Sequence, residues 1–209
     1  KHVPMYRRIT EFINKNKSIA AMQIGHSGRK AACGPPWTNF QPLTASDAGK
    51  GMPPWQGVSA SAVAHRADAQ APHALTVTEI REVIDAWREA ALRTLDAGFE
   101  MVEIHGAHGY LLSQFLSPIS NLRQDRYGGD LQGRMAFPLE VARAVRAVWP
   151  RHKALGVRLN ATELDERAIT IDQALEHVRA FKAVGVDCVT MSAGNAVPGR
   201  TYPPLVPGY

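Results

Sequence analysis

The chain alternates amphipathic helical stretches with short apolar runs, and this alternation constrains its fold more than any other feature. The clearest unit occurs twice, at residues 96–104 and 183–191. In each copy a helix end leads through a glycine, Gly98 or Gly185, to an acidic residue and then into an apolar strand. Helices that alternate with near-continuous apolar strands predict a parallel sheet covered by helices.

Hydrophobic periodicity predicts four helices and four strands. The helices are expected at residues 4–16, 76–98, 134–149 and 170–184, and the strands at residues 18–24, 101–104, 155–159 and 189–192. Two of the helices begin with capping boxes, Thr76–Glu79 and Thr170–Gln173. Residues 31–75 are rich in Pro, Gly, Ala and Ser and form a long loop excursion. Trp37 and Trp55 predict that this excursion is packed; the alternative is that they line the mouth of the substrate site.

Each expected strand ends in a polar side chain that can take part in chemistry: Gln23, His105, Arg158 or Ser192. Such residues at the C-terminal ends of parallel strands favour a (β/α)8 TIM barrel over an open sheet. Four strands are about half of such a barrel, and half a barrel leaves two sheet edges open. We therefore expect residues 1–209 to be the central portion of one barrel domain, completed by further chain or by a partner.

Composition excludes several classes of protein. No run of 18 apolar residues is present, so we expect no membrane span. The net charge is +5, but the basic residues are scattered, so we expect no nucleic-acid partner. Two cysteines do not make a disulfide framework and fit a reducing cytoplasm. Of these, Cys188 falls in an apolar strand and is expected in the core, and Cys33 falls in a loop.

The segment after the second strand carries the most chemistry. His105, His108 and Tyr110 lie within six residues, and Gly106 and Gly109 let the backbone turn between them. Two imidazoles can jointly donate hydrogen bonds to one anionic oxygen, and a phenol can supply a proton to the same substrate. These residues therefore predict a site that binds a carbonyl oxygen or an oxyanion.

Two other interpretations of the histidines remain open. An HxxH pair has a metal-ligand spacing, but zinc enzymes carry it on a helix with an intervening Glu, and here Gly106 and Ala107 intervene. No third ligand is obvious nearby, so we expect no metal. Alternatively, His105 and His108 are packed histidines with satisfied hydrogen bonds.

Five segments together resemble the Old Yellow Enzyme family, which are FMN-dependent NAD(P)H oxidoreductases. The segments are Gln23–Lys30, His105–Leu112, Phe115–Asn121, Asp125–Gly129 and Val157–Leu159. Their order and spacing fit the family's third to sixth barrel strands. Residues 28–31 and 55–62 resemble the bacterial branch of xenobiotic reductases and thermophilic-type ene-reductases.

The resemblance implies a reaction and a set of roles. FMN accepts a hydride from NADPH or NADH and passes it to an electron-poor alkene, such as an enone or a nitroalkene. His105 and His108 would bind the substrate oxygen, and Tyr110 would donate the proton. Gln23 would contact the flavin pyrimidine edge, and Arg158 would stabilise the reduced flavin. For Arg158 an ion pair with an acidic neighbour, Glu103 or Asp187, is the alternative.

Other functions are compatible with the same motifs. Relatives with an added iron-sulfur cluster, of the dienoyl-CoA reductase or amine demethylase type, share His-Gly-Tyr-Leu-like segments. A truncated or split barrel piece would be non-catalytic and would assemble through its open edges. Members of the family often form homo-oligomers. The choice between NADH and NADPH is not encoded in these segments.

Overall fold

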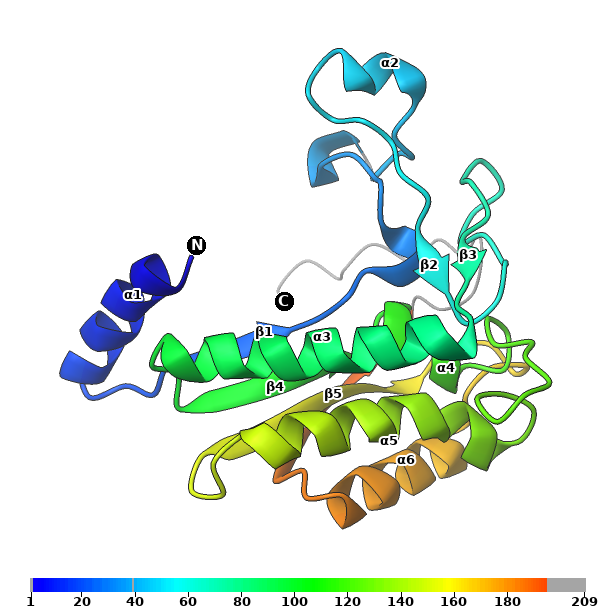
Figure 1. The fold of residues 1–209 in the computed structure, drawn as a ribbon. Coiled ribbons are helices and arrows are strands. Elements are labelled where there is room, and N and C mark those ends of the chain that lie inside the picture. The colour runs from blue at the N-terminus through cyan, green and yellow to red at the C-terminus, as the bar shows by residue number, and fades with distance from the viewer. Residues whose placement is uncertain (1, 39, 195–209) are drawn as a thin grey trace, which may run out of the picture.

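Four parallel strands form the central sheet, in the order β1-β4-β5-β6 (Figure 1). The structure, a computed structural model, describes residues 2–38 and 40–194. The strands are β1 (Ala21–Ile24), β4 (Met101–Gly106), β5 (Ala154–Thr162) and β6 (Cys188–Ala193). All three pairings are parallel, so the C-terminal ends of the strands meet at one edge. The predicted parallel sheet is confirmed.

Helices cover one face of this sheet. They are α3 (Val77–Asp96), α5 (Leu131–Val148) and α6 (Ile171–Ala183), with α1 (Val3–Lys15) beside α3 (Figure 1). Alternate strand residues point towards these helices and form the core. Fully buried examples are Val102, Ile104, Leu155, Val157 and Leu159. The four predicted helices are therefore confirmed, and the opposite face of the sheet is left for polar side chains.

The capping box predicted at the start of α3 forms completely, whereas only one of the two hydrogen bonds predicted at the start of α6 is present. Before α3, the Glu79 N–H donates to Thr76 Oγ1 (3.2 Å) and the Thr76 N–H donates to Glu79 Oε2 (2.7 Å). Before α6, the Gln173 N–H donates to Thr170 Oγ1 (3.2 Å). The buried Gln173 Oε1 has no hydrogen-bond partner among the described residues, so this second box is half formed.

Two helices differ from the periodicity prediction. The helix α4 (Leu111–Leu116) was not predicted, because all six of its residues are buried and it shows no polar face. The helix α5 begins three residues before the expected position. Asp130 is its N-cap and accepts a hydrogen bond from the Gly133 N–H (2.8 Å). Hydrophobic periodicity missed this start because the first turn of the helix is only weakly apolar.

The segment between β1 and α3 projects from the sheet (Figure 1). It contains two 3₁₀ helices, η1 (Gly28–Lys30) and η2 (Pro36–Thr38), and the short helix α2 (Ala45–Ala48). It also contains the two-residue strands β2 (Val58–Ser59) and β3 (His73–Ala74), which pair in parallel. The prediction that the tryptophans are packed here was wrong. Trp37 is 85 % exposed and Trp55 is 57 % exposed, because this segment stands away from the helices and the sheet.

The predicted core position of Cys188 was also wrong. Cys188 is exposed, and Cys33 is partly buried. On β6 the side chain of Cys188 lies opposite Gly156 of β5, on the face that the helices do not cover. The alternation of side chains along the strand, rather than its overall apolarity, determines this exposure.

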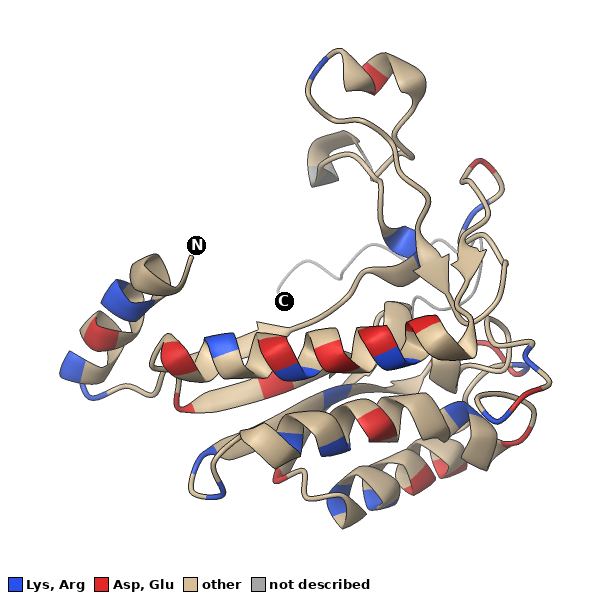
Figure 2. Cartoon of the chain, viewed as in Figure 1, with Lys and Arg blue, Asp and Glu red and all other residues tan. Residues whose placement is uncertain are grey.

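Acidic and basic side chains are interspersed along α3, α5 and α6 (Figure 2). The net charge of +5 is therefore not gathered on these helices as a basic stripe. In the described part of the chain, no helix combines the length and apolarity that crossing a membrane requires.

Candidate active site

The face of the sheet that lacks helices carries a row of polar side chains. The Gln23 Nε2 of β1 donates to Glu103 Oε2 of β4 (2.5 Å), and Thr190 Oγ1 of β6 donates to Glu103 Oε1 (2.6 Å). The second bond crosses β5, where Gly156 has no side chain to block it. A Cβ at Gly156 would lie 3.4 Å from Glu103 Cγ. Arg158 shares this face, because it pairs in register with His105 of β4 and Thr190 of β6.

The three predicted catalytic residues converge at the C-terminal end of β4. His105 is the residue before the last one of β4, His108 is in the connection that follows, and Tyr110 is the N-cap of α4. The ring of His105 lies 5.0 Å from that of His108 and 4.9 Å from that of Tyr110, centroid to centroid, both edge-on. The structure therefore brings together two imidazoles and one phenol that can meet a single substrate.

The environment of His105 selects one neutral form of its ring. The Ala107 N–H donates to His105 Nδ1 (3.2 Å), so the proton of the neutral ring resides on Nε2. Burial lowers the pKa of His105 to about 4, and the charges of His108 and Arg158 add to this effect. His105 is therefore a neutral hydrogen-bond donor through Nε2 at pH 7.

The ring of His108 contacts a serine, and its main chain has an unusual conformation. Its Nε2 lies 2.6 Å from Ser192 Oγ, the polar residue that ends the fourth predicted strand. Its main-chain φ is +58°, which is in the left-handed region. Burial lowers its pKa, as do the nearby charges of Arg158 and Lys30. A neutral ring is thus also favoured for His108.

Arg158 does not form either of the ion pairs considered as its alternative role. Glu103 accepts from Gln23 and Thr190, and Asp187 pairs with Arg146 (3.1 Å). The Nε of Arg158 is buried and has no hydrogen-bond partner in the described parts of the chain. A buried guanidinium atom without a partner is costly, so this face can accept an anionic or carbonyl group of a ligand.

Two residues that the sequence did not single out contact the same loop. Lys30 Nζ donates to the His108 carbonyl (2.7 Å) and lies 5.7 Å from the centre of the Tyr110 ring. Asn160 Oδ1 accepts from the His108 N–H (3.1 Å). Asn160 could have been found from strand alternation, because it lies two residues beyond Arg158 on the same face. For Lys30 no periodic signal exists, since it lies in an irregular segment.

A buried carboxyl lies behind this loop. Glu163 is 0 % exposed and accepts hydrogen bonds from Ser117 Oγ (2.6 Å) and Asn160 Nδ2 (3.5 Å). Burial raises the pKa of Glu163 to about 7, although these hydrogen bonds and the charge of Arg29 act in the opposite direction. Glu163 therefore joins the end of β5 to the start of the connection after α4.

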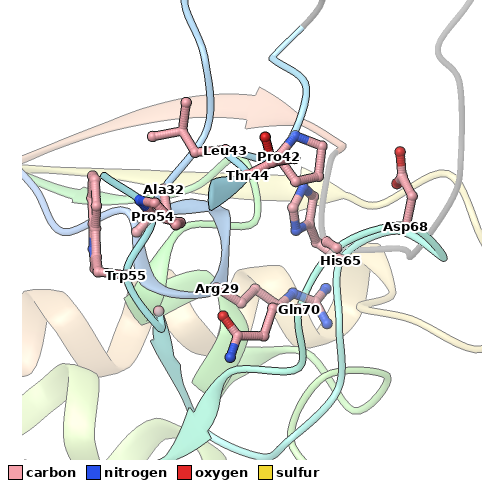
Figure 3. A pocket seen from close by; sticks show the side chains of 13 residues that line it. Arg29, Ala32, Pro42, Leu43, Thr44, Pro54, Trp55, His65, Asp68 and Gln70 are labelled. Carbon is pink, nitrogen blue, oxygen red and sulfur yellow. The ribbon is translucent and has the colours of Figure 1, made fainter. Parts of the chain in front are cut away.

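A cavity of about 200 Å³ lies at the base of the excursion (Figure 3). Its lining includes the side chains of Arg29, Trp55 and His65, and none of the five predicted site residues is among it. The predicted site is instead the open inner face of the sheet. The residues that the structure describes contain no group of three His, Cys, Asp or Glu side chains placed to hold a metal.

Comparisons with known proteins match this architecture. The family described as NADH:flavin oxidoreductase / NADH oxidase matches residues 1–201. An NADPH dehydrogenase of Clostridium acetobutylicum is 37 % identical over all of this chain and 56 % of its own length. A 2-naphthoyl-CoA reductase in complex with 2-naphthoyl-CoA has a TM-score of 0.79 at 26 % identity, over 95 % of this chain and 30 % of that one. Morphinone reductase in complex with tetrahydroNAD has a TM-score of 0.72 at 27 % identity, over 90 % and 53 %.

The chain spans about half the length of the curated relatives it matches. The structural relatives are TIM barrels, so the predicted fold class is confirmed, and this chain supplies four adjacent strands of such a barrel. The match over residues 1–201 also confirms the family that the five sequence segments indicated. The chain therefore belongs to the NADH:flavin oxidoreductase / NADH oxidase family, the Old Yellow Enzyme family.

Proposed function

We propose that the protein containing this chain is an FMN-dependent ene-reductase, which uses NADPH or NADH to reduce the activated C=C bond of enones, nitroalkenes or related electrophiles. The observation that carries the proposal is the convergence of His105, His108 and Tyr110 at the C-terminal end of one strand, where the centroid of the His105 ring lies 5.0 Å from that of His108 and 4.9 Å from that of Tyr110. That edge is where TIM-barrel enzymes house their chemistry. Membership of a flavin oxidoreductase family supports the choice of reaction.

The inner face of the sheet fits FMN. Gln23 presents an exposed carboxamide, which can donate to and accept from the edge of a pyrimidine ring. Arg158 has a buried Nε without a partner in the described residues, and its fixed charge suits a ring on which negative charge collects. Gln23 and Arg158 would therefore hold the flavin. Bound FMN supplies the hydride chemistry, and NADPH or NADH supplies the electrons.

His105 and His108 would bind the oxygen of the substrate carbonyl or nitro group. The neutral His105 ring donates through Nε2, because Nδ1 is occupied by the Ala107 N–H. Each donor aimed at an oxygen that gains negative charge contributes roughly 2.7–4 kcal/mol to transition-state stabilisation. Because the pKa of His105 is lowered to about 4, this donor does not change its charge between pH 5 and 8.

Tyr110 would donate the proton to the α-carbon of the alkene. The phenol lies beside His105, so the oxygen-binding group and the proton donor lie on the same side of the site. A positioned general acid contributes about 10²–10⁴-fold to the rate of such a step. Tyr110 has no hydroxyl hydrogen bond to another described residue, so its proton remains available to a substrate.

Stopped-flow kinetics follow the reduction of the flavin by NADPH and its reoxidation by the alkene separately. These two half-reactions test the proposed roles. With 2-cyclohexenone, Tyr110→Phe should slow reoxidation by about 10²-fold or more and leave reduction by NADPH unchanged. His105→Ala should weaken enone binding. Matched control variants are Tyr6→Phe and His152→Ala, at exposed positions away from the site. Reoxidation of the Tyr110→Phe variant at the wild-type rate would refute the proposed proton donor.

A second candidate reaction is reduction of an aromatic acyl-CoA thioester. The structural similarity to 2-naphthoyl-CoA reductase favours it, with a TM-score of 0.79. The two candidates share the histidines and differ in the substrate they accept. Supplying 2-naphthoyl-CoA in place of 2-cyclohexenone distinguishes them, because only the second candidate predicts faster flavin reoxidation by the thioester.

We propose that further strands complete the barrel, from the same chain or from a partner chain, and that the protein forms a homo-oligomer. Among the described residues, β1 and β6 are the edges of the central sheet, and open edges favour strand pairing. Light scattering of the native protein tests the oligomer, which a monomeric mass would refute.

The free thiols of Cys33 and Cys188 support a cytoplasmic location.

A further inference from the structure

The backbone of His108 adopts a conformation that is disfavoured for residues other than glycine. Its φ of +58° is in the left-handed region, where a residue with a Cβ is disfavoured. It lies in the connection between β4 and α4, beyond the ladder hydrogen bonds of the strand. Contacts from elsewhere must therefore hold this residue in place.

Side chains from two distant elements hold both polar groups of the His108 main chain. Asn160, in the last part of β5, accepts from the N–H through Oδ1 (3.1 Å). Lys30, at the end of η1, donates to the carbonyl through Nζ (2.7 Å). The two residues are separated from His108 by 52 and 78 positions in sequence, so these bonds form only in the folded chain.

We propose that Lys30 and Asn160 are positioning residues, a His108 clamp that fixes the direction of the His108 imidazole relative to His105 and Tyr110. They act through the His108 peptide groups rather than on the substrate. The catalytic consequence of the clamp rests on the proposed function, whereas the clamp itself is a property of the fold.

The contacts around Asn160 show why it can serve this role. Asn160 is 2 % exposed, and its Nδ2 donates to Ser113 Oγ (3.2 Å) and to the Gly194 carbonyl (3.0 Å). These bonds leave Oδ1 directed at the His108 N–H. An amide whose donors and acceptor are all engaged has one orientation, and it transmits that orientation to its partner.

Lys30 contacts both His108 and Tyr110. Its ammonium lies 5.7 Å from the Tyr110 ring while it holds the His108 carbonyl. Burial, with the neighbouring charge of Arg29, lowers the pKa of Lys30 to about 8, so the ammonium form still predominates at pH 7. A buried ammonium needs acceptors, and the His108 carbonyl and the Tyr110 π-face satisfy this need.

Amide hydrogen exchange followed by NMR tests the clamp directly. In Asn160→Leu the His108 amide loses its acceptor and should exchange at least about tenfold faster than in the wild type. Lys30→Met should shift the Gly109 amide resonance, because Gly109 shares a peptide group with the His108 carbonyl, and Lys30→Arg should restore it in part. Lys50→Met, at an exposed lysine, is the matched control. Unchanged exchange and unchanged resonances in both clamp variants would overturn the proposal.

A double-mutant cycle then tests the positioning role. Asn160→Leu and Lys30→Met should each lower kcat/KM for 2-cyclohexenone by about 10–100-fold, and these losses should largely vanish in a His108→Ala background. Additive losses would mean that the residues do not act through His108. The exchange measurement needs neither flavin nor substrate, so a protein that lacks the proposed activity would still show whether the clamp exists.

Discussion

Replacing Glu163 with glutamine should make the protein more stable at neutral and alkaline pH and leave it nearly unchanged in acid. The carboxyl of Glu163 is 0 % exposed, and burial raises its pKa from 4.5 to about 7. Between these two pH values the folded state binds more protons than the unfolded state, so the free energy of unfolding falls as the pH rises. The stabilising contribution is fully present below pH 4.5 and is lost as the pH rises through 7.

The size of this effect follows from the shift. A difference of 2.5 pKa units corresponds to about 3 kcal/mol. Glu163→Gln abolishes this titration, so the variant should gain about 3 kcal/mol relative to the wild type between pH 4.5 and pH 8. The hydrogen bond from Ser117 Oγ (2.6 Å) favours the ionised carboxyl and is already included in the raised pKa, so it is not subtracted a second time.

Urea unfolding at several pH values measures the difference between the two proteins. Histidines with lowered pKa values, such as His177 (about 4), make the free energy of unfolding rise as the pH rises. This contribution is the same in both proteins, so it cancels when their free energies of unfolding are subtracted. Glu166→Gln is the matched control, because Glu166 is exposed and lies three residues away. A difference between Glu163→Gln and the wild type that stays constant from pH 4.5 to pH 8 would refute the reasoning.

Three further substitutions test the fold, each measured by urea unfolding. Thr76→Ala removes the N-cap hydroxyl of α3 and should cost about 1 kcal/mol, so a loss near zero would contradict the capping role. Gly133→Ala places a Cβ on the carbonyl of Gly128 and should cost about 3 kcal/mol or prevent folding, whereas a stable variant would show that this approach is not close. Arg146→Met removes the donor to the Trp149 carbonyl and one of the two donors to Asp187, and a loss of about 2 kcal/mol is expected; wild-type stability would refute it.

The sequence predicted the regular elements well and the irregular ones poorly, for a physical reason. The helices α3, α5 and α6 and the strands β4 and β5 each bury one face, and this requirement imposes a period on the sequence. The helix α1 carries the same kind of apolar stripe, but Tyr6, Ile9 and Phe12 on that stripe are exposed. The helix α4 (Leu111–Leu116) is buried on all sides, so it leaves no such period. The exposed position of Trp37 depends on where the surrounding chain runs, which residue type alone does not encode. The exposure of Cys188 follows from its place in the alternation of β6, which the overall apolarity of the strand does not show.

In the candidate site, too, the residues on regular strands could be predicted from the sequence, and the contacts between distant segments could not. Gln23, His105 and Arg158 could be placed from sequence, because the ends of parallel strands meet at one edge. The bonds from Lys30 and Asn160 to His108 could not, since they join residues more than 50 positions apart in ways that local pattern does not specify. The pKa shift of Glu163 likewise arises from tertiary burial.

The most direct test of the central claim is the absorbance spectrum of the native protein between 300 and 550 nm, recorded anaerobically before and after NADPH. The account predicts a flavin band that bleaches with NADPH and returns when 2-cyclohexenone is added. A protein that neither carries nor takes up FMN would contradict the account. So would a bound flavin that, once reduced, is reoxidised no faster with 2-cyclohexenone than with buffer.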